Sequence, residues 1–186
     1  MLSPLVRSFI TLKEMLQDRD IDTSELNKIS DAELESMHKV KPIFSIAVND
    51  KVNIIYHMNQ KFQITAIKKI IEPERKSIFV FKEKINTLNI KNLKELTGEI
   101  GMEIFGLKEL LINISKHQLV PKHEIMSEQD IKLLLEKYQL KQRSMLPIIQ
   151  KTDPMARYLD VKSGDIVKVT RPSLSAGEAI VYRYCV

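Results

Sequence analysis

The sequence is poor in the residues that hold a chain together by covalent bonds or by metal ions. One residue of 186 is a cysteine, Cys185, and four are histidines. A single cysteine cannot form an internal disulfide or supply a thiolate metal cage. No activating pattern surrounds Cys185, so we interpret it as a half-buried structural thiol.

Long apolar runs are also missing. No stretch approaches the roughly 18 apolar residues that a membrane span requires, and the N-terminal stretch mixes charged residues with helical periodicity too early for a secretory signal. Hydrophobic residues make up 44% of the chain and charged residues 28%. These proportions predict a soluble, intracellular globular protein with one or two modest cores and no membrane association.

Positive charge is concentrated in one segment. Between Lys61 and Lys94, nine Lys and Arg residues stand against three Glu, a net charge of +6, whereas the whole chain carries +5. A basic segment of this kind suits contact with phosphates. The alternative is a solvated lysine-rich face, which composition alone favours over phosphate contact.

The first hundred residues have the pattern of a small α/β domain. Apolar residues at helical spacing from Leu5 to Leu16 predict an amphipathic first helix, and two short capped helices follow it. Two β-prone runs flank Asn49-Asp50, a dipeptide that tolerates the positive φ of a tight hairpin turn. We expect a helix over 62–71, a strand over 77–81 and a helix over 88–96. The glycines at 98, 101 and 106 lack nucleotide-loop spacing and are interpreted as turns.

The last third has clearer boundaries. Ser127 is expected to cap a helix whose apolar residues recur from Ile131 to Tyr138. Asp153-Pro154 is expected to begin a second, shorter helix, with a carboxylate cap followed by proline at the first position. Two β-runs, DIVKVTR and AIVYRYCV, are joined by the turn-rich PSLSAGE. We therefore expect a small sheet covered by two helices.

One stretch, SKHQLVPKHEIMS, is crowded with groups that could hold a metal or move a proton. His117 and His123 lie six residues apart with Pro121 between them, so neither a helix nor an extended chain brings them onto one metal. The spacing argues against a local zinc or acid/base site. Pro121 favours an extended chain before it, and we interpret the stretch as a lead-in to the following helix.

A family resemblance rests on this region. ELLINISKHQLVPKHEIMS is followed by further motifs in one order: LLEKY at Leu134–Tyr138, DPMARY at Asp153–Tyr158, KSGDIVKVTRPS at Lys162–Ser173 and AGEAIVYR at Ala176–Arg183. Together they closely resemble the assembly domain of the fifth subunit shared by the eukaryotic nuclear RNA polymerases. The equivalent small subunit of archaeal RNA polymerase is similar over this domain and lacks the jaw domain that precedes it in eukaryotes. The first hundred residues resemble the eukaryotic jaw domain more loosely.

The resemblance implies an α+β protein of two domains. Residues 1–108 would form a jaw domain, a small α/β unit with a nuclease-like fold but no evident active site, and residues 109–186 the assembly domain. The implied function is that of a non-catalytic subunit of a multisubunit DNA-directed RNA polymerase. Its partners would be the largest subunit, other polymerase subunits and downstream double-stranded DNA, with no cofactor, metal or small-molecule substrate.

The resemblance also implies candidate contact residues. In the family the loop after the central jaw strand approaches downstream DNA, and the matching positions here are Lys82, Lys84, Asn86, Thr87, Lys91 and Lys94. In the assembly domain the candidates for subunit docking or domain shape are His123, Asp153, Pro154, Arg157, Tyr158, Arg171, Gly177 and Arg183. The implied location is the nucleus in a cell. The Ile-, Asn- and Lys-rich jaw would suit a protist with an A·T-rich genome or a large DNA virus, and in the viral case the protein would be in host cytoplasm or virion.

Two rival functions start from the same residues. A nuclease-like jaw would need carboxylates and a lysine around a metal ion, and Glu74-Arg75-Lys76 supplies a Glu-x-Lys triplet. The triplet precedes the expected strand, and Asp50, the only aspartate of the middle region, lies in the expected hairpin turn. A free-standing DNA-binding factor is the second alternative. We favour the polymerase subunit over both.

Overall fold

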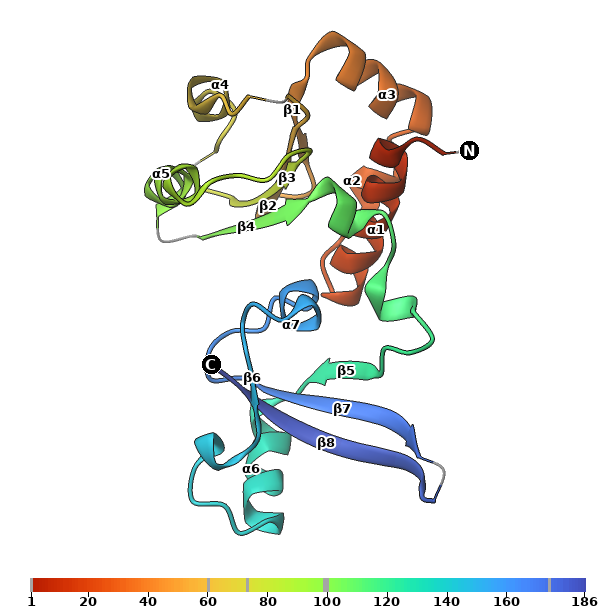
Figure 1. Ribbon diagram of the computed structural model, residues 1–186, viewed down its shortest axis with the longest axis vertical. Coiled ribbons are helices and arrows are strands. Elements are labelled where there is room, and N and C mark those ends of the chain that lie inside the picture. Colours follow the sequence, from red (N-terminus) through yellow and green to blue (C-terminus); the bar gives the residue numbers. More distant parts are fainter. Residues whose placement is uncertain (1, 60, 73, 99–100, 174) are drawn as a thin grey trace. The chain divides into compact units, whose positions relative to one another are not determined.

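The computed structural model describes residues 2–59, 61–72, 74–98, 101–173 and 175–186. The chain divides into two compact units, Met1–Ile112 and Asn113–Val186, drawn in Figure 1. The expected domain limits of 1–108 and 109–186 fall a few residues before this division. Both units combine helices with a β-sheet, which confirms the α+β class. Across the described residues, every helix is too short or too polar to span a bilayer.

The N-terminal unit begins with the expected helices. Helix α1 (Pro4–Asp18) has Pro4 in its first turn, and the Ser3 hydroxyl accepts a hydrogen bond from the Val6 amide at 3.4 Å. It buries Leu5, Phe9, Leu12 and Leu16, as the periodicity predicted. Helices α2 (Ser24–Asn27) and α3 (Asp31–Val40) follow, and a reciprocal Ser30–Glu33 capping box begins α3.

The described part of this unit contains one four-stranded sheet in the order β1-β2-β3-β4. Its strands are β1 (Ile43–Ala47), β2 (Val52–His57), β3 (Lys76–Phe81) and β4 (Met102–Gly106). The β1–β2 pair is the expected antiparallel hairpin, and β2, β3 and β4 run parallel. The turn differs from expectation, because neither Asn49 nor Asp50 has positive φ. Instead, the Asn49 Oδ1 accepts hydrogen bonds from the Lys51 and Val52 amides, both at 2.9 Å.

Helices cover both faces of this sheet. On one face, α4 (Ile64–Lys68) and α5 (Thr87–Thr97) connect the parallel strands and contribute Ile67 and Leu93 to a core with Ile55 and Phe79. On the other face, Ser8 of α1 lies 3.3 Å from the Tyr56 hydroxyl of β2. Strand β4 was not expected from the sequence: Gly106 ends this strand and is not a turn residue.

The described part of the C-terminal unit forms a second four-stranded sheet, in the order β5-β7-β8-β6. The strands are β5 (Lys122–Ile125), β6 (Ile148–Ile149), β7 (Ile166–Ser173) and β8 (Gly177–Cys185). Strands β7 and β8 form a hairpin longer than expected, because Pro172 pairs with Glu178 and Ser173 with Gly177. The ends of PSLSAGE therefore belong to strands. The stretch around His123, interpreted from the sequence as a lead-in to a helix, contains strand β5. Strand β6 was not expected from the sequence either.

One helix packs against each face of the second sheet. Helix α6 (Glu128–Lys137), capped by Ser127 as expected, packs its Ile131 and Leu134 against Ile166 of β7. Helix α7 (Pro154–Tyr158) belongs to a second cluster on the opposite face. Cys185 is part of that cluster and is fully buried, more than the half-burial expected. Burial raises the pKa of its thiol, which keeps the group protonated and unreactive at neutral pH.

Candidate functional site

The α7 face of the C-terminal sheet carries an open groove of about 520 Å³. Its floor is apolar, with Ile149, Met155, Val169 and Val181 among the lining residues. Several docking candidates from the sequence meet at its walls although they come from different elements: His123, Asp153, Pro154, Arg171 and Arg183. We call this surface the α7 groove.

Asp153 and Pro154 build the wall of the α7 groove that α7 forms. The Asp153 carboxylate accepts hydrogen bonds from the Met155 amide at 2.9 Å and the Ala156 amide at 3.4 Å. Pro154 occupies the first helical turn, where its missing N–H leaves no intrahelical bond unmade. This arrangement matches the expected cap, and the Asp153 side chain therefore serves the local fold as well as the groove.

Two arginines give the α7 groove its charge. Arg171 and Arg183 are both exposed and lie on the neighbouring strands β7 and β8. Arg183 donates a hydrogen bond to the Ile148 carbonyl at 3.1 Å. Within the described residues neither guanidinium forms an ion pair. The groove thus presents an apolar floor between positive charges that remain available to an acidic partner.

The other assembly-domain candidates lie outside the lining of the α7 groove. Tyr158 is buried, and its hydroxyl accepts hydrogen bonds from Asn113 Nδ2 at 3.1 Å and Ser115 Oγ at 3.2 Å. These bonds connect the start of the unit to α7, the helix that also contains Arg157. Gly177 has φ 72° at the hairpin turn, a conformation that favours glycine. The contacts of Tyr158 and the backbone of Gly177 are those of structural residues.

The two histidines of the SKHQLVPKHEIMS stretch do not meet. His117 Nδ1 accepts a hydrogen bond from the Leu119 amide at 3.2 Å, whereas His123 Nδ1 lies 2.7 Å from the Pro121 carbonyl. Each ring is therefore engaged with its own local backbone. Among the described residues, no group of three or more His, Cys, Asp or Glu side chains is arranged to hold a metal ion.

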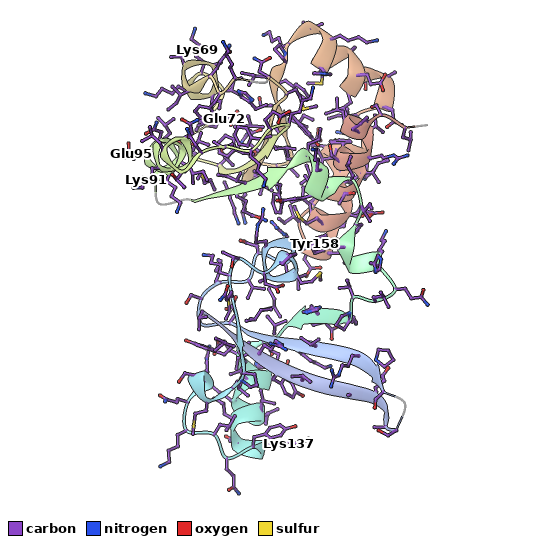
Figure 2. The ribbon with its side chains drawn as sticks, in the orientation of Figure 1. Lys69, Glu72, Lys91, Glu95, Lys137 and Tyr158 are labelled. Carbon is purple, nitrogen blue, oxygen red and sulfur yellow. The ribbon has the colours of Figure 1, made fainter. Side chains whose placement is uncertain are left out.

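The DNA-proximal candidates form an exposed surface on the N-terminal unit. Lys82 and Lys84 follow β3, while Lys91 and Lys94 lie on α5, and all four are exposed. Figure 2 shows the Lys91 side chain extending from α5. Within the described part of the chain none of the four forms an ion pair.

The start of helix α5 determines which of these residues share a face of the helix. The Asn86 side chain accepts a hydrogen bond from the Asn89 amide at 3.0 Å and so caps α5. Thr87, Lys91 and Lys94 then follow at i, i+4 and i+7, which places them on one face of that helix. We call Lys82, Lys84, Lys91 and Lys94 the lysine surface.

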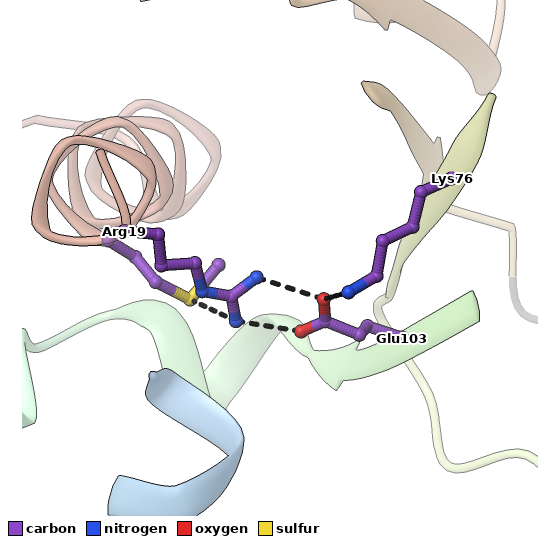
Figure 3. Close-up of polar contacts among 4 residues, drawn as sticks. Arg19, Lys76 and Glu103 are labelled. Atoms are coloured by element: carbon purple, nitrogen blue, oxygen red, sulfur yellow. Dashed lines mark hydrogen bonds and ion pairs between the residues drawn. The ribbon is translucent and has the colours of Figure 1, made fainter. Parts of the chain in front are cut away.

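Several residues of the rival nuclease interpretation form ion pairs with other side chains. Arg75 lies 2.8 Å from the Glu72 carboxylate and 3.6 Å from that of Asp50. Lys76 of the Glu-x-Lys triplet is bonded to Glu103 of β4 at 2.7 Å. Figure 3 shows Glu103 held between Lys76 and Arg19. This is the geometry of a structural ion-pair cluster, in which two cations already neutralise the Glu103 carboxylate.

A second groove, on the α6 face of the C-terminal sheet, was missed by sequence reasoning. It also measures about 520 Å³, and Ile125, Leu133, Ile180 and Tyr182 are among its lining residues. Ile125, Leu133 and Ile180 are 44%, 64% and 47% exposed and line the same groove, and a group of exposed apolar side chains of this kind marks an interaction surface. We call this surface the α6 groove. The available signal was Leu133, which the helical periodicity leaves off the buried stripe of α6.

Comparison with known proteins identifies the family. Residues 112–185 match the family model of the RNA polymerase Rpb5 C-terminal domain. The DNA-directed RNA polymerases I, II, and III subunit of Dictyostelium discoideum is 33% identical over 186 residues, which cover 95% of this chain and 94% of that protein. The corresponding subunit of Caenorhabditis briggsae is 31% identical over 181 residues, covering 95% and 82%. This chain belongs to the Rpb5 family of RNA polymerase subunits.

Proposed function

We propose that this protein is a non-catalytic subunit of a multisubunit DNA-directed RNA polymerase. The observation that carries the proposal is the similarity of almost the whole chain to subunits shared by RNA polymerases I, II and III. Lys76, the lysine of the rival nuclease interpretation, is paired with Glu103, as expected of a structural residue in a non-catalytic subunit. In a cellular organism the protein is then nuclear, and in a large DNA virus it would work in the host cytoplasm or the virion.

The C-terminal unit is the assembly domain of this proposal, and it docks on the largest polymerase subunit through the α7 groove. Support comes from the convergence of five candidate residues on one groove and from its two exposed arginines, which form no ion pair with the described residues. An apolar floor flanked by Arg side chains is typical of the buried centre of a protein interface, where Arg is enriched. The matching surface of the partner would carry acidic side chains around an apolar one.

The N-terminal unit is the jaw of this proposal, and its lysine surface faces downstream double-stranded DNA. Four exposed lysines that form no ion pair with any described residue are available to neutralise phosphates. Such contacts would hold a duplex in place without reading its sequence.

Purification through a tag on the full chain tests the assignment. We expect two very large polymerase chains to be recovered in stoichiometric amount. Arg171→Glu combined with Arg183→Glu should reduce that recovery, whereas Lys141→Glu combined with Lys162→Glu, the same charge change at exposed positions of the same unit, should not. A chain that binds DNA but recovers no polymerase would instead be a free-standing factor. Magnesium-dependent nicking of supercoiled plasmid would favour a nuclease.

A further inference from the structure

Within the described residues, strand β8 has an open edge along most of its length. It pairs with β7 from Gly177 to Tyr184, but on its other side the only described partner is β6, which pairs with Tyr184 and Cys185. Pro147 explains why the pairing stops there. Its carbonyl accepts the Tyr184 amide at 2.8 Å, but proline has no N–H to donate to the Tyr182 carbonyl, the next group along the edge.

The direction of each backbone group along this edge follows from two hydrogen bonds. The Tyr184 amide donates towards β6, whereas the Cys185 amide donates to the Asp165 carbonyl at 2.9 Å, on the β7 side. Consecutive residues of a strand alternate in this way. The N–H and C=O groups of Tyr182 and Ile180 therefore point to the open side, and those of Val181 and Arg183 point into the hairpin.

The centre of this edge lacks the features that usually keep a strand edge from pairing. Such features are charged side chains, proline, bulges and very short strands. The opposite edge strand, β5, is short and carries Lys122, His123 and Glu124, and the uncovered end of β7 carries Arg171 and Pro172. The open part of β8 has Glu178 and Arg183 near its two ends, and the four residues between them, Ala-Ile-Val-Tyr from 179 to 182, contain no charge and no proline.

The edge also separates the two grooves described above. Ile180 and Tyr182 line the α6 groove, while Val181 and Arg183 line the α7 groove. A strand paired with β8 would send alternate side chains into each groove. Cross-strand neighbours would then be apolar beside Ile180 and Val181, and acidic beside the exposed guanidinium of Arg183.

We propose that the open edge of β8 accepts an extended segment of another polymerase subunit as a fifth strand of this sheet. The segment has apolar side chains on both faces and a carboxylate placed beside Arg183. Main-chain hydrogen bonds to Ile180 and Tyr182 supply much of the binding, and the grooves supply its specificity. The inference rests on the proposed function, because it takes the partner from the polymerase.

Amide hydrogen exchange with residue resolution tests this edge in the full chain, free and within purified polymerase. In the free chain the amides of Ile180 and Tyr182 should exchange quickly and those of Val181 and Arg183 slowly. On assembly the first two should slow by roughly tenfold or more, while the second two stay slow. Unchanged fast exchange at Ile180 and Tyr182 in a polymerase that contains the chain would overturn the inference and leave the proposed function standing. Failure to recover polymerase would overturn both.

A pair of variants separates the backbone contribution from that of the side chain. Ile180→Pro removes an outward N–H without removing a β7–β8 hydrogen bond, as edge positions allow. Ile180→Ala shortens the side chain but keeps the N–H. We expect Ile180→Pro to lower polymerase recovery at least about tenfold more than Ile180→Ala, with similar circular dichroism spectra for both free chains. Equal recovery would overturn the inference. So would concentration-dependent protection in the isolated chain, since it would identify a second copy as the occupant.

Discussion

Arg19 and Glu103 form a two-point ion pair although they lie 84 residues apart in sequence. The two guanidinium nitrogens of Arg19 lie 2.9 and 2.7 Å from the Glu103 carboxylate oxygens, and Lys76 adds a third contact at 2.7 Å. The side chains of Arg19 and Glu103 are only 5% and 13% exposed. The pair joins the end of α1 to β4, so the first helix is fixed to the last strand of its sheet.

Glu103→Ala should therefore destabilise the N-terminal unit by roughly 3–5 kcal/mol, because it removes from a mostly buried position the carboxylate that both Arg19 and Lys76 contact. Glu25→Ala is the matched control, since it breaks the exposed Glu25–Lys28 pair and should change stability little. Urea denaturation followed by circular dichroism measures both variants. Equal midpoints for the two would contradict a structural role for this pair.

The Arg19–Glu103 pair is an example of a contact that the sequence alone does not predict. The caps at Ser30, Ser127 and Asp153 were predictable because each depends on residues within three positions along the chain. The partners of Glu103 come from two distant elements, and no local pattern indicates them. The same holds for the α7 groove: its residues were named from a resemblance, but their convergence depends on strand pairing.

The missed strands have a similar cause. Strand β5 reads Lys-His-Glu-Ile, and β6 has only two residues. Neither has the alternation or length that predicts a strand, and both are extended because a neighbouring strand pairs with them. Strand β4 begins after Gly101 and ends at Gly106. The two glycines suggested turns from the sequence, but pairing with β3 makes the segment a strand.

Stability of the N-terminal unit should fall in mild acid because of His57. This side chain is buried against Phe62 and Phe81, and burial lowers the pKa of its imidazole below 6.5. Between that lowered pKa and about 6.5 the unfolded chain binds more protons than the folded one, so stability decreases as pH falls through this window.

Urea midpoints measured at several pH values between about 7.5 and 5 would test this effect. His57→Gln should show a shallower loss of stability than the wild-type chain, because glutamine keeps a polar side chain but does not titrate. Titrations of other groups are common to both proteins and cancel in the comparison. Parallel pH profiles would show that His57 does not contribute.

The Asp153 cap gives a prediction for the C-terminal unit. Asp153→Ala should cost about 0.5–2 kcal/mol, because the amides of Met155 and Ala156 lose their acceptor. Asp153→Asn keeps an oxygen at the same place and should recover most of that stability. Chemical denaturation of the full chain measures both. An alanine variant as stable as the wild type would mean that the cap contributes nothing.

The lysine surface gives the last prediction, on DNA binding by the assembled polymerase. Each lost phosphate contact should lower the steepness of log affinity against log salt by roughly 0.9, so replacing Lys82, Lys84 and Lys91 by Gln together should flatten the slope by up to about 2–3 units. Replacing Lys39, Lys41 and Lys51, which are also exposed on this unit, changes the charge equally and should leave the slope unchanged. Polymerase recovery should be the same for both triple variants. If the first variant leaves the slope unchanged, another surface of the unit must approach the DNA, and if both variants flatten it equally, the effect belongs to net charge.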